Sequence, residues 1–87
     1  MSQYVYKNSN DTIRISIHDV EHEDGRKREW NVDVWTLNAD GTSTVTTYAE
    51  ESGDLFPTRK AAKETYTQTY GPLTSINPQE TVTNGWP

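Results

Sequence analysis

The 87-residue chain contains no cysteine, which excludes disulfide bonds and thiolate-coordinated zinc. Hydrophobic residues make up 31% of the chain, and no apolar run approaches the roughly 18 residues that a membrane-spanning helix needs. The N-terminal residues lack the basic-then-apolar pattern of a secretion signal, so we expect a cytoplasmic protein with no membrane partner. The length indicates a single small domain.

Sequence patterns for catalysis are also missing. The chain has no glycine-rich phosphate loop and no nucleophile motif of the G-x-S-x-G type. His18 and His22 lie in an acidic run, but on an extended strand they would be about 13 Å apart, too far to bind one metal ion. We therefore expect no catalytic residues, no metal site, no cofactor and no enzymatic activity.

The chain also lacks an excess of basic residues, because it has 13 acidic and 8 basic residues and a net charge of −5. This charge excludes a broadly basic nucleic-acid-binding protein. The charges are clustered, with an acidic run at 18–24 followed directly by a basic run at 25–29. Two oppositely charged runs in succession are typical of the two sides of one hairpin tip.

Strict alternation of apolar and polar residues is the clearest pattern in the chain. It runs through 12–20 and 28–37 and predicts two half-buried strands. Asp24 and Gly25 lie between them and predict a type I′ turn. That turn fixes the register, with Ile17 opposite Val32. The other predicted pairs are Ile15 with Val34, Arg14 with Trp35, Glu23 with Arg26, and Glu21 with Arg28.

A third strand is predicted at 42–50, after a turn at 38–41. A two-residue turn and a four-residue loop both place Val45, Thr47 and Ala49 on the core face. A short additional strand at 4–6 stays an open alternative.

A helix is predicted after Thr58, which has the properties of an N-cap, and it ends at Gly71. Its core face carries Ala62, Tyr66 and Tyr70. The remaining residues, 73–87, show no periodicity and predict an extended, partly mobile tail. The predicted fold is therefore α+β: a three- to four-stranded antiparallel meander with one C-terminal helix packed on one face, forming a domain at 1–72.

The sheet face away from the helix is the first candidate binding surface. By alternation it includes an aromatic and aliphatic group within a polar rim, which is typical of recognition surfaces. Coverage by the N-terminal segment, by the tail or by a second copy of the chain is the alternative. The candidate residues are Arg14, His18, Asp33, Trp35, Leu37 and Tyr48.

The start of the predicted helix is the second candidate, because Arg59, Lys60 and Lys63 flank a helix N-terminus that favours anions. Over six residues it resembles the start of the last helix in double-stranded RNA-binding domains, and the resemblance implies phosphate contacts by these three cations. The helix that precedes the sheet in that family has no counterpart here, so we assign no family.

The sequence thus predicts a small interaction domain that binds a protein partner or itself through the open sheet face. Small, acidic, cysteine-free chains of this kind are common among accessory and inhibitor proteins of phages and mobile elements. The alternative is a nucleic-acid-binding domain that uses the basic helix start, or stacks bases on Trp35 and Tyr48.

Overall fold

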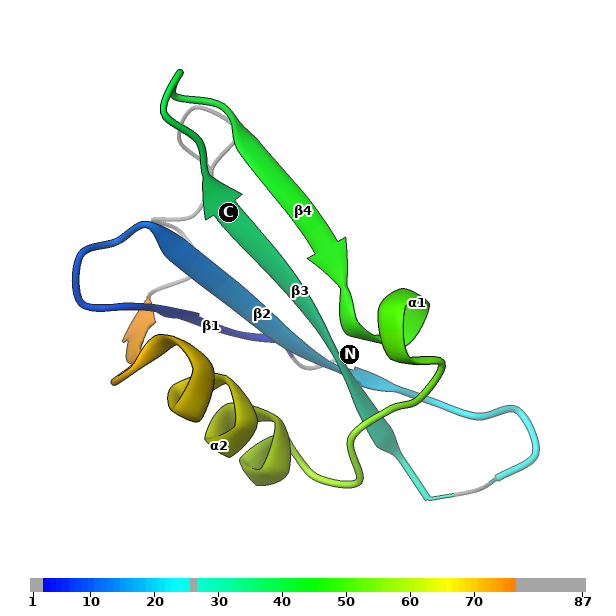
Figure 1. Cartoon of the computed structure of the whole chain (residues 1–87). Helices are drawn as coiled ribbons and strands as arrows, with labels where there is room; N and C mark the ends of the chain where they lie inside the picture. The colour runs from blue at the N-terminus through cyan, green and yellow to red at the C-terminus, as the bar shows by residue number, and fades with distance from the viewer. Residues whose placement is uncertain (1–2, 26, 77–87) are drawn as a thin grey trace.

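The computed structural model describes residues 3–25 and 27–76, which form an antiparallel sheet with two helices (Figure 1). This arrangement confirms the predicted α+β class. The elements are β1 (Gln3–Lys7), β2 (Ile13–Val20), β3 (Glu29–Leu37), β4 (Ser43–Thr47), α1 (Tyr48–Ser52), α2 (Arg59–Tyr70) and β5 (Thr74–Ile76).

The sheet has five strands in the order β4-β3-β2-β1-β5, and every neighbouring pair is antiparallel. The predicted meander is present, and the optional strand near the N-terminus is β1. The prediction of three to four strands and one helix was too low by β5 and α1. β5 comes from the segment expected to be a tail and pairs with β1, with Ile76 opposite Val5. The rest of that segment, 77–87, lies outside the described residues.

The predicted register between β2 and β3 is confirmed, with Ile17 opposite Val32 and Arg14 opposite Trp35. The predicted type I′ turn does not form. Such a turn requires positive φ at Asp24, but Asp11 is the only residue other than glycine with positive φ among those the structure describes. The turn is closed by the Gly25 N–H, which donates to the His22 carbonyl at 3.2 Å.

Charge pairing near this hairpin tip is partly described. Regular pairing stops where Val20 faces Glu29. Beyond it Arg28 still reaches Glu21 at 3.0 Å, as the predicted register requires. The expected contact of Glu23 involves Arg26, which lies outside the described residues.

The side of β4 that faces the core was predicted wrongly. Trp35 pairs with Val45, and Val34 pairs with Thr46. Val45 therefore lies on the face away from the core, where it is 53% exposed. Thr44 and Thr46 take the core side, and Ala49 is in α1 rather than in the strand.

The reason is the loop that joins β3 to β4. The Asn38 N–H donates to the Thr42 carbonyl at 2.7 Å, and the Gly41 N–H donates to the Asn38 carbonyl at 3.1 Å. Gly41 has φ 87°. This is the three-residue class of hairpin loop, a type I turn followed by a left-handed glycine. Because its length is odd, it shifts the pairing by one residue and moves every β4 side chain to the opposite face.

Gly41→Ala should therefore destabilise the fold. A side chain in the left-handed region costs about 1–2 kcal/mol, although no heavy atom lies within 4 Å of the place a Cβ would take. The loss is measured by urea unfolding. Gly41→Asn is the matched control, because asparagine tolerates this conformation. Equal losses for both variants would mean that the left-handed backbone at Gly41 is not the cause.

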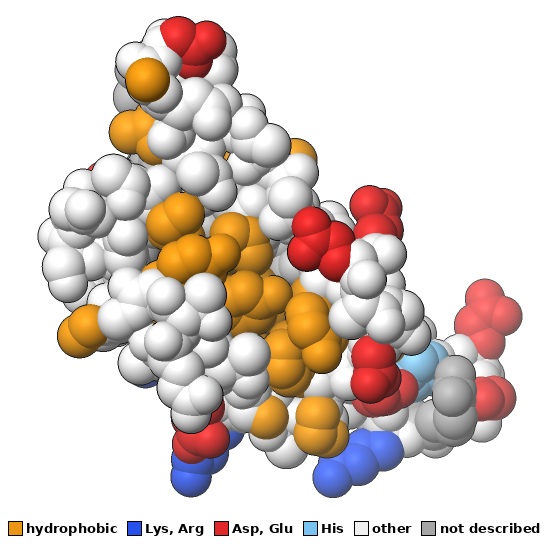
Figure 2. Space-filling view, viewed as in Figure 1, with side chains coloured by type: hydrophobic (Ala, Val, Ile, Leu, Met, Phe, Trp, Pro, Cys, Tyr) orange, Lys and Arg blue, Asp and Glu red, His pale blue; other side chains and the backbone are white. Residues whose placement is uncertain are grey.

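The core lies between the sheet and α2, and Figure 2 shows hydrophobic side chains gathered over the middle of the sheet, between α1 and α2. α2 begins at the predicted cap, where the Thr58 hydroxyl accepts the Ala61 N–H at 3.0 Å. Ala62 of α2 is fully buried against the sheet. The buried core consists of Tyr6, Ile15, Ile17, Val32, Val34, Phe56 and Ala62.

Candidate protein-binding surface

An apolar group lies on the face away from α2, at the β3–β4 side of the sheet. Trp35 of β3 sits between Arg14 of β2 and Val45 of β4 in the cross-strand register. Val45 and Leu37 are 53% and 40% exposed, and Trp35 is half-buried. We call Trp35, Leu37 and Val45 the Trp35 patch. Val45 is the member that the sequence missed, because the parity of β4 depends on the hairpin loop.

The other half of this face is closed. Val5 and Ser16, which lie side by side on β1 and β2, are 3% and 0% exposed. The Ser16 hydroxyl accepts a hydrogen bond from the Gln3 amide at 2.7 Å. Among the described residues, the most exposed large apolar side chains of this face are therefore Leu37 of β3 and Val45 of β4.

Arg14 borders the Trp35 patch and is held in place. Its Nε and Nη2 donate to the two carboxylate oxygens of Asp11, each at 2.9 Å. Its side chain is 11% exposed. A bidentate ion pair of this kind fixes the guanidinium plane. Arg14 is therefore a positioned polar rim beside Trp35.

His18 and Asp33 continue the polar rim on the same face. The Nδ1 atom of His18 lies 3.8 Å from a carboxylate oxygen of Asp33. The other oxygen of Asp33 accepts a hydrogen bond from the Thr47 hydroxyl at 3.1 Å. Both side chains are half-buried, so Asp33 has partners from two neighbouring strands and orders the surface next to Trp35.

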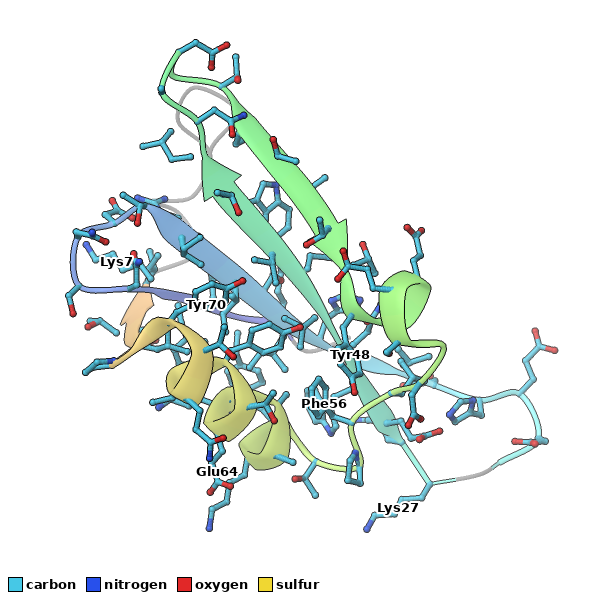
Figure 3. All side chains as sticks on the ribbon, in the orientation of Figure 1. Lys7, Lys27, Tyr48, Phe56, Glu64 and Tyr70 are labelled. Carbon is cyan, nitrogen blue, oxygen red and sulfur yellow. The ribbon has the colours of Figure 1, made fainter. Side chains whose placement is uncertain are left out.

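Tyr48 is the candidate that the structure places elsewhere. It begins α1 and stacks on Phe56, with ring centroids 4.1 Å apart (Figure 3). The ring centroid of Phe56 lies 6.2 Å from that of Tyr66, and the ring centroid of Tyr66 lies 6.0 Å from that of Tyr70. Burial raises the pKa of Tyr66 to about 12. Tyr48 thus belongs to a row of rings on the helix side, and the predicted platform of Trp35 with Tyr48 does not form.

The missed signal for this arrangement is the segment that follows Tyr48. Ala49, Glu50 and Glu51 favour a helix more than a strand, and the acids lie in the first turn, where the helix dipole favours them. Gly53 ends the helix in the left-handed conformation, and its N–H donates to the Ala49 carbonyl at 2.9 Å. The last residues of the strand predicted at 42–50 therefore form the start of α1 instead.

The basic residues at the start of α2 are largely engaged with β1. The Arg59 guanidinium lies 3.9 Å from the centroid of the Tyr4 ring, and the Lys63 ammonium lies 5.0 Å from that of Tyr6. Lys60 lies 4.0 Å from Glu64, and its side chain is 85% exposed. Attraction to the tyrosine ring faces holds Arg59 and Lys63 over the sheet. Sequence reasoning placed all three at the helix start and missed this packing.

The two histidines have separate carboxylate partners, because His22 Nε2 lies 2.8 Å from Glu29 and His18 faces Asp33. Within 3–25 and 27–76, no three His, Asp or Glu side chains come together as a metal ion would require. No helix in the same ranges is long and apolar enough to cross a membrane.

No family model, curated protein or solved structure matches this chain. The functional interpretation therefore depends on the geometry of its surfaces, above all on the Trp35 patch and the start of α2.

Proposed function

We propose that this protein is a small, non-enzymatic interaction domain that binds a protein partner through the Trp35 patch. The observation that carries the proposal is the cross-strand row in which half-buried Trp35 lies between exposed Val45 and the fixed Arg14–Asp11 ion pair. Tryptophan and arginine are enriched at interface hot spots, where weaker surrounding contacts exclude water, and Trp35 beside Arg14, with Val45 and Leu37 around them, has this composition. We place the protein in the cytoplasm, among accessory or inhibitor proteins of phages and mobile elements.

The second candidate function is phosphate binding at the start of α2. Lys60, highly exposed in the first turn, favours it. Against it, Arg59 and Lys63 lie over tyrosine rings, and Thr58 already accepts one of the N–H groups at the helix start. Binding a phosphate there would require these cations to leave their rings, and the net charge of −5 would oppose the approach of a polyanion.

Affinity capture with two variants separates the candidates. Immobilised wild type, Trp35→Ala and Lys60→Ala are exposed to lysate from the source cells, with and without nuclease, and bound proteins are quantified by mass spectrometry. We expect wild type and Lys60→Ala to retain the same protein in similar amounts. Trp35→Ala should retain at least about tenfold less of it. Nuclease should change nothing. Thermal unfolding shows whether each variant is folded.

The opposite pattern would overturn the proposal. Capture that survives Trp35→Ala, falls with Lys60→Ala and disappears after nuclease treatment would assign the function to the start of α2. A titration of duplex RNA and duplex DNA at low and high salt would then show saturable binding that weakens steeply as salt rises.

A further inference from the structure

β4 is an open edge of the sheet. It is the outermost strand in the order β4-β3-β2-β1-β5, and its sequence, STVTT, contains no charged residue and no proline. Proteins usually protect an edge with charges, proline or a very short strand. The opposite edge, β5, is only three residues long. β4 thus lacks these protections.

The hydrogen-bonding groups at this edge follow from the hairpin. The Asn38 N–H donates to the Thr42 carbonyl, so the Thr42 carbonyl points toward β3. Along an antiparallel strand, every second residue bonds to the same neighbouring strand. Thr44 and Thr46 therefore bond to β3. The backbone N–H and C=O groups of Ser43 and Val45 and the N–H of Thr47 therefore point away from the sheet, where a further strand would pair with them. Thr47 is the N-cap of α1, so its carbonyl belongs to the helix.

Side chains on both faces are suited to receive such a strand. On one face, a residue opposite Val45 would extend the row that begins at Trp35. On the other face, α2 packs against β2 and β3, and Figure 1 shows α2 and β4 on opposite sides of the sheet. Hydrophobic side chains gather over the middle of the sheet on this face (Figure 2). An added strand with an aliphatic residue opposite Val45 would bury apolar surface on the Trp35 face, and on the other face it would lie beside Thr44 and Thr46.

The charges at the two ends of β4 indicate which strand fits. Asp40 precedes it, and the hydroxyl and amide of Thr42 donate to Asp40 and lower its pKa, which keeps it ionised. Glu50 and Glu51 follow in α1 and are exposed. If two copies paired antiparallel with Val45 opposite Val45, the loop end of one β4, which carries Asp40, would lie beside the α1 end of the other, which carries Glu50 and Glu51. A second copy is therefore a poor match, and a strand with basic ends is a good one.

We propose that the β4 edge binds an extended segment of a protein partner, aliphatic in its centre and with Lys or Arg at its ends, which adds to the sheet as a further antiparallel strand. The proposal rests on the proposed function and names the partner chemistry of the same surface. Backbone pairing with Ser43, Val45 and Thr47 would supply affinity, and the Trp35 patch with the flanking acids would supply specificity.

The test uses the blocked synthetic peptide KTVTVTK and amide NMR spectra of the isotope-labelled full chain. We expect saturable shifts at Ser43, Val45 and Thr47. Affinity should fall at least tenfold for ETVTVTE, whose ends repel the acids. It should fall as much for a peptide N-methylated at alternate residues, which cannot donate to the edge. Val45→Lys should weaken binding of KTVTVTK at least tenfold, whereas Ser75→Lys on the opposite edge should leave it unchanged.

Several results would overturn the strand addition. These are no saturable shift with KTVTVTK, shifts confined to 58–63, equal binding of the N-methylated peptide, or a concentration-dependent dimer that Val45→Lys abolishes. If the peptide fails while capture from lysate still depends on Trp35, the strand addition is wrong and the proposed function stands. If capture is also independent of Trp35, both are wrong.

Discussion

Phe56→Ala is expected to lower the free energy of unfolding by about 3–5 kcal/mol. Phe56 is 7% exposed and joins three parts of the fold. Its ring stacks on Tyr48 and meets Tyr66, and its backbone exchanges two hydrogen bonds with Trp30, at 2.8 and 2.9 Å. Removing the ring leaves a cavity and also ends ring contacts worth about 0.5–1.5 kcal/mol each.

The loss is measured by urea unfolding, followed by tryptophan emission and circular dichroism. For a domain of this size it corresponds to a fall in Tm of roughly 12 °C or more. Phe56→Leu is the matched control and should cost less than about 1.5 kcal/mol, because it keeps most of the buried volume. A loss below 1 kcal/mol for Phe56→Ala would mean that the row of rings does not stabilise α1 against α2.

Ile17→Ala is the second large effect, at about 3–4 kcal/mol within the range for fully buried isoleucine. Ile17 is 0% exposed and lies between Tyr4 of β1 and Val32 of β3. Neighbours from both strands and from α2 would have to move to fill the space. Since small domains are stable by about 5–15 kcal/mol in total, this variant should lose a large part of its stability.

Ile13→Ala on the same strand is the control. Ile13 is half-buried at the start of β2, so the same substitution removes less buried area and should cost about 1 kcal/mol. Both variants are compared by urea unfolding under identical conditions. Similar losses at the two positions would contradict a core centred on Ile17, and would place it nearer the Asp11 turn.

The pairing of β2 with β3 was predictable because both strands carry the same alternation and opposite charges flank the turn. The apolar pair of Ile17 with Val32 favours this register in the middle of the two strands, and the ion pair of Arg28 with Glu21 favours it near the turn. The correct register came out even though the turn is not type I′. Side-chain burial specified it more strongly than the turn did.

The parity of β4 was not predictable in the same way. Its threonines are compatible with either face, so its alternation carries little information. The loop class then decides the face, and the sequence from Asn38 to Gly41 is compatible with loops of even and odd length. One residue of difference moves Val45 from the core to the surface, and the candidate site moves with it.

The candidate site was predicted in part. Arg14, His18, Asp33, Trp35 and Leu37 follow from the alternation of β2 and β3, and the structure places them on one face. Tyr48 was assigned by extending β4 into what is one turn of helix. The positions of Arg59 and Lys63 over Tyr4 and Tyr6 depend on how α2 crosses β1, a tertiary contact with no local signal in the sequence.

Binding of a protein partner at the Trp35 patch and the β4 edge is tested by an amide NMR map of the labelled chain on addition of the protein captured from lysate. We expect the signals of Ser43, Val45 and Thr47 and of the Trp35 indole to shift or broaden, while those of 58–63 stay in place. Changes confined to 58–63, with the Trp35 indole unaffected, would contradict it and would assign recognition to the basic start of α2.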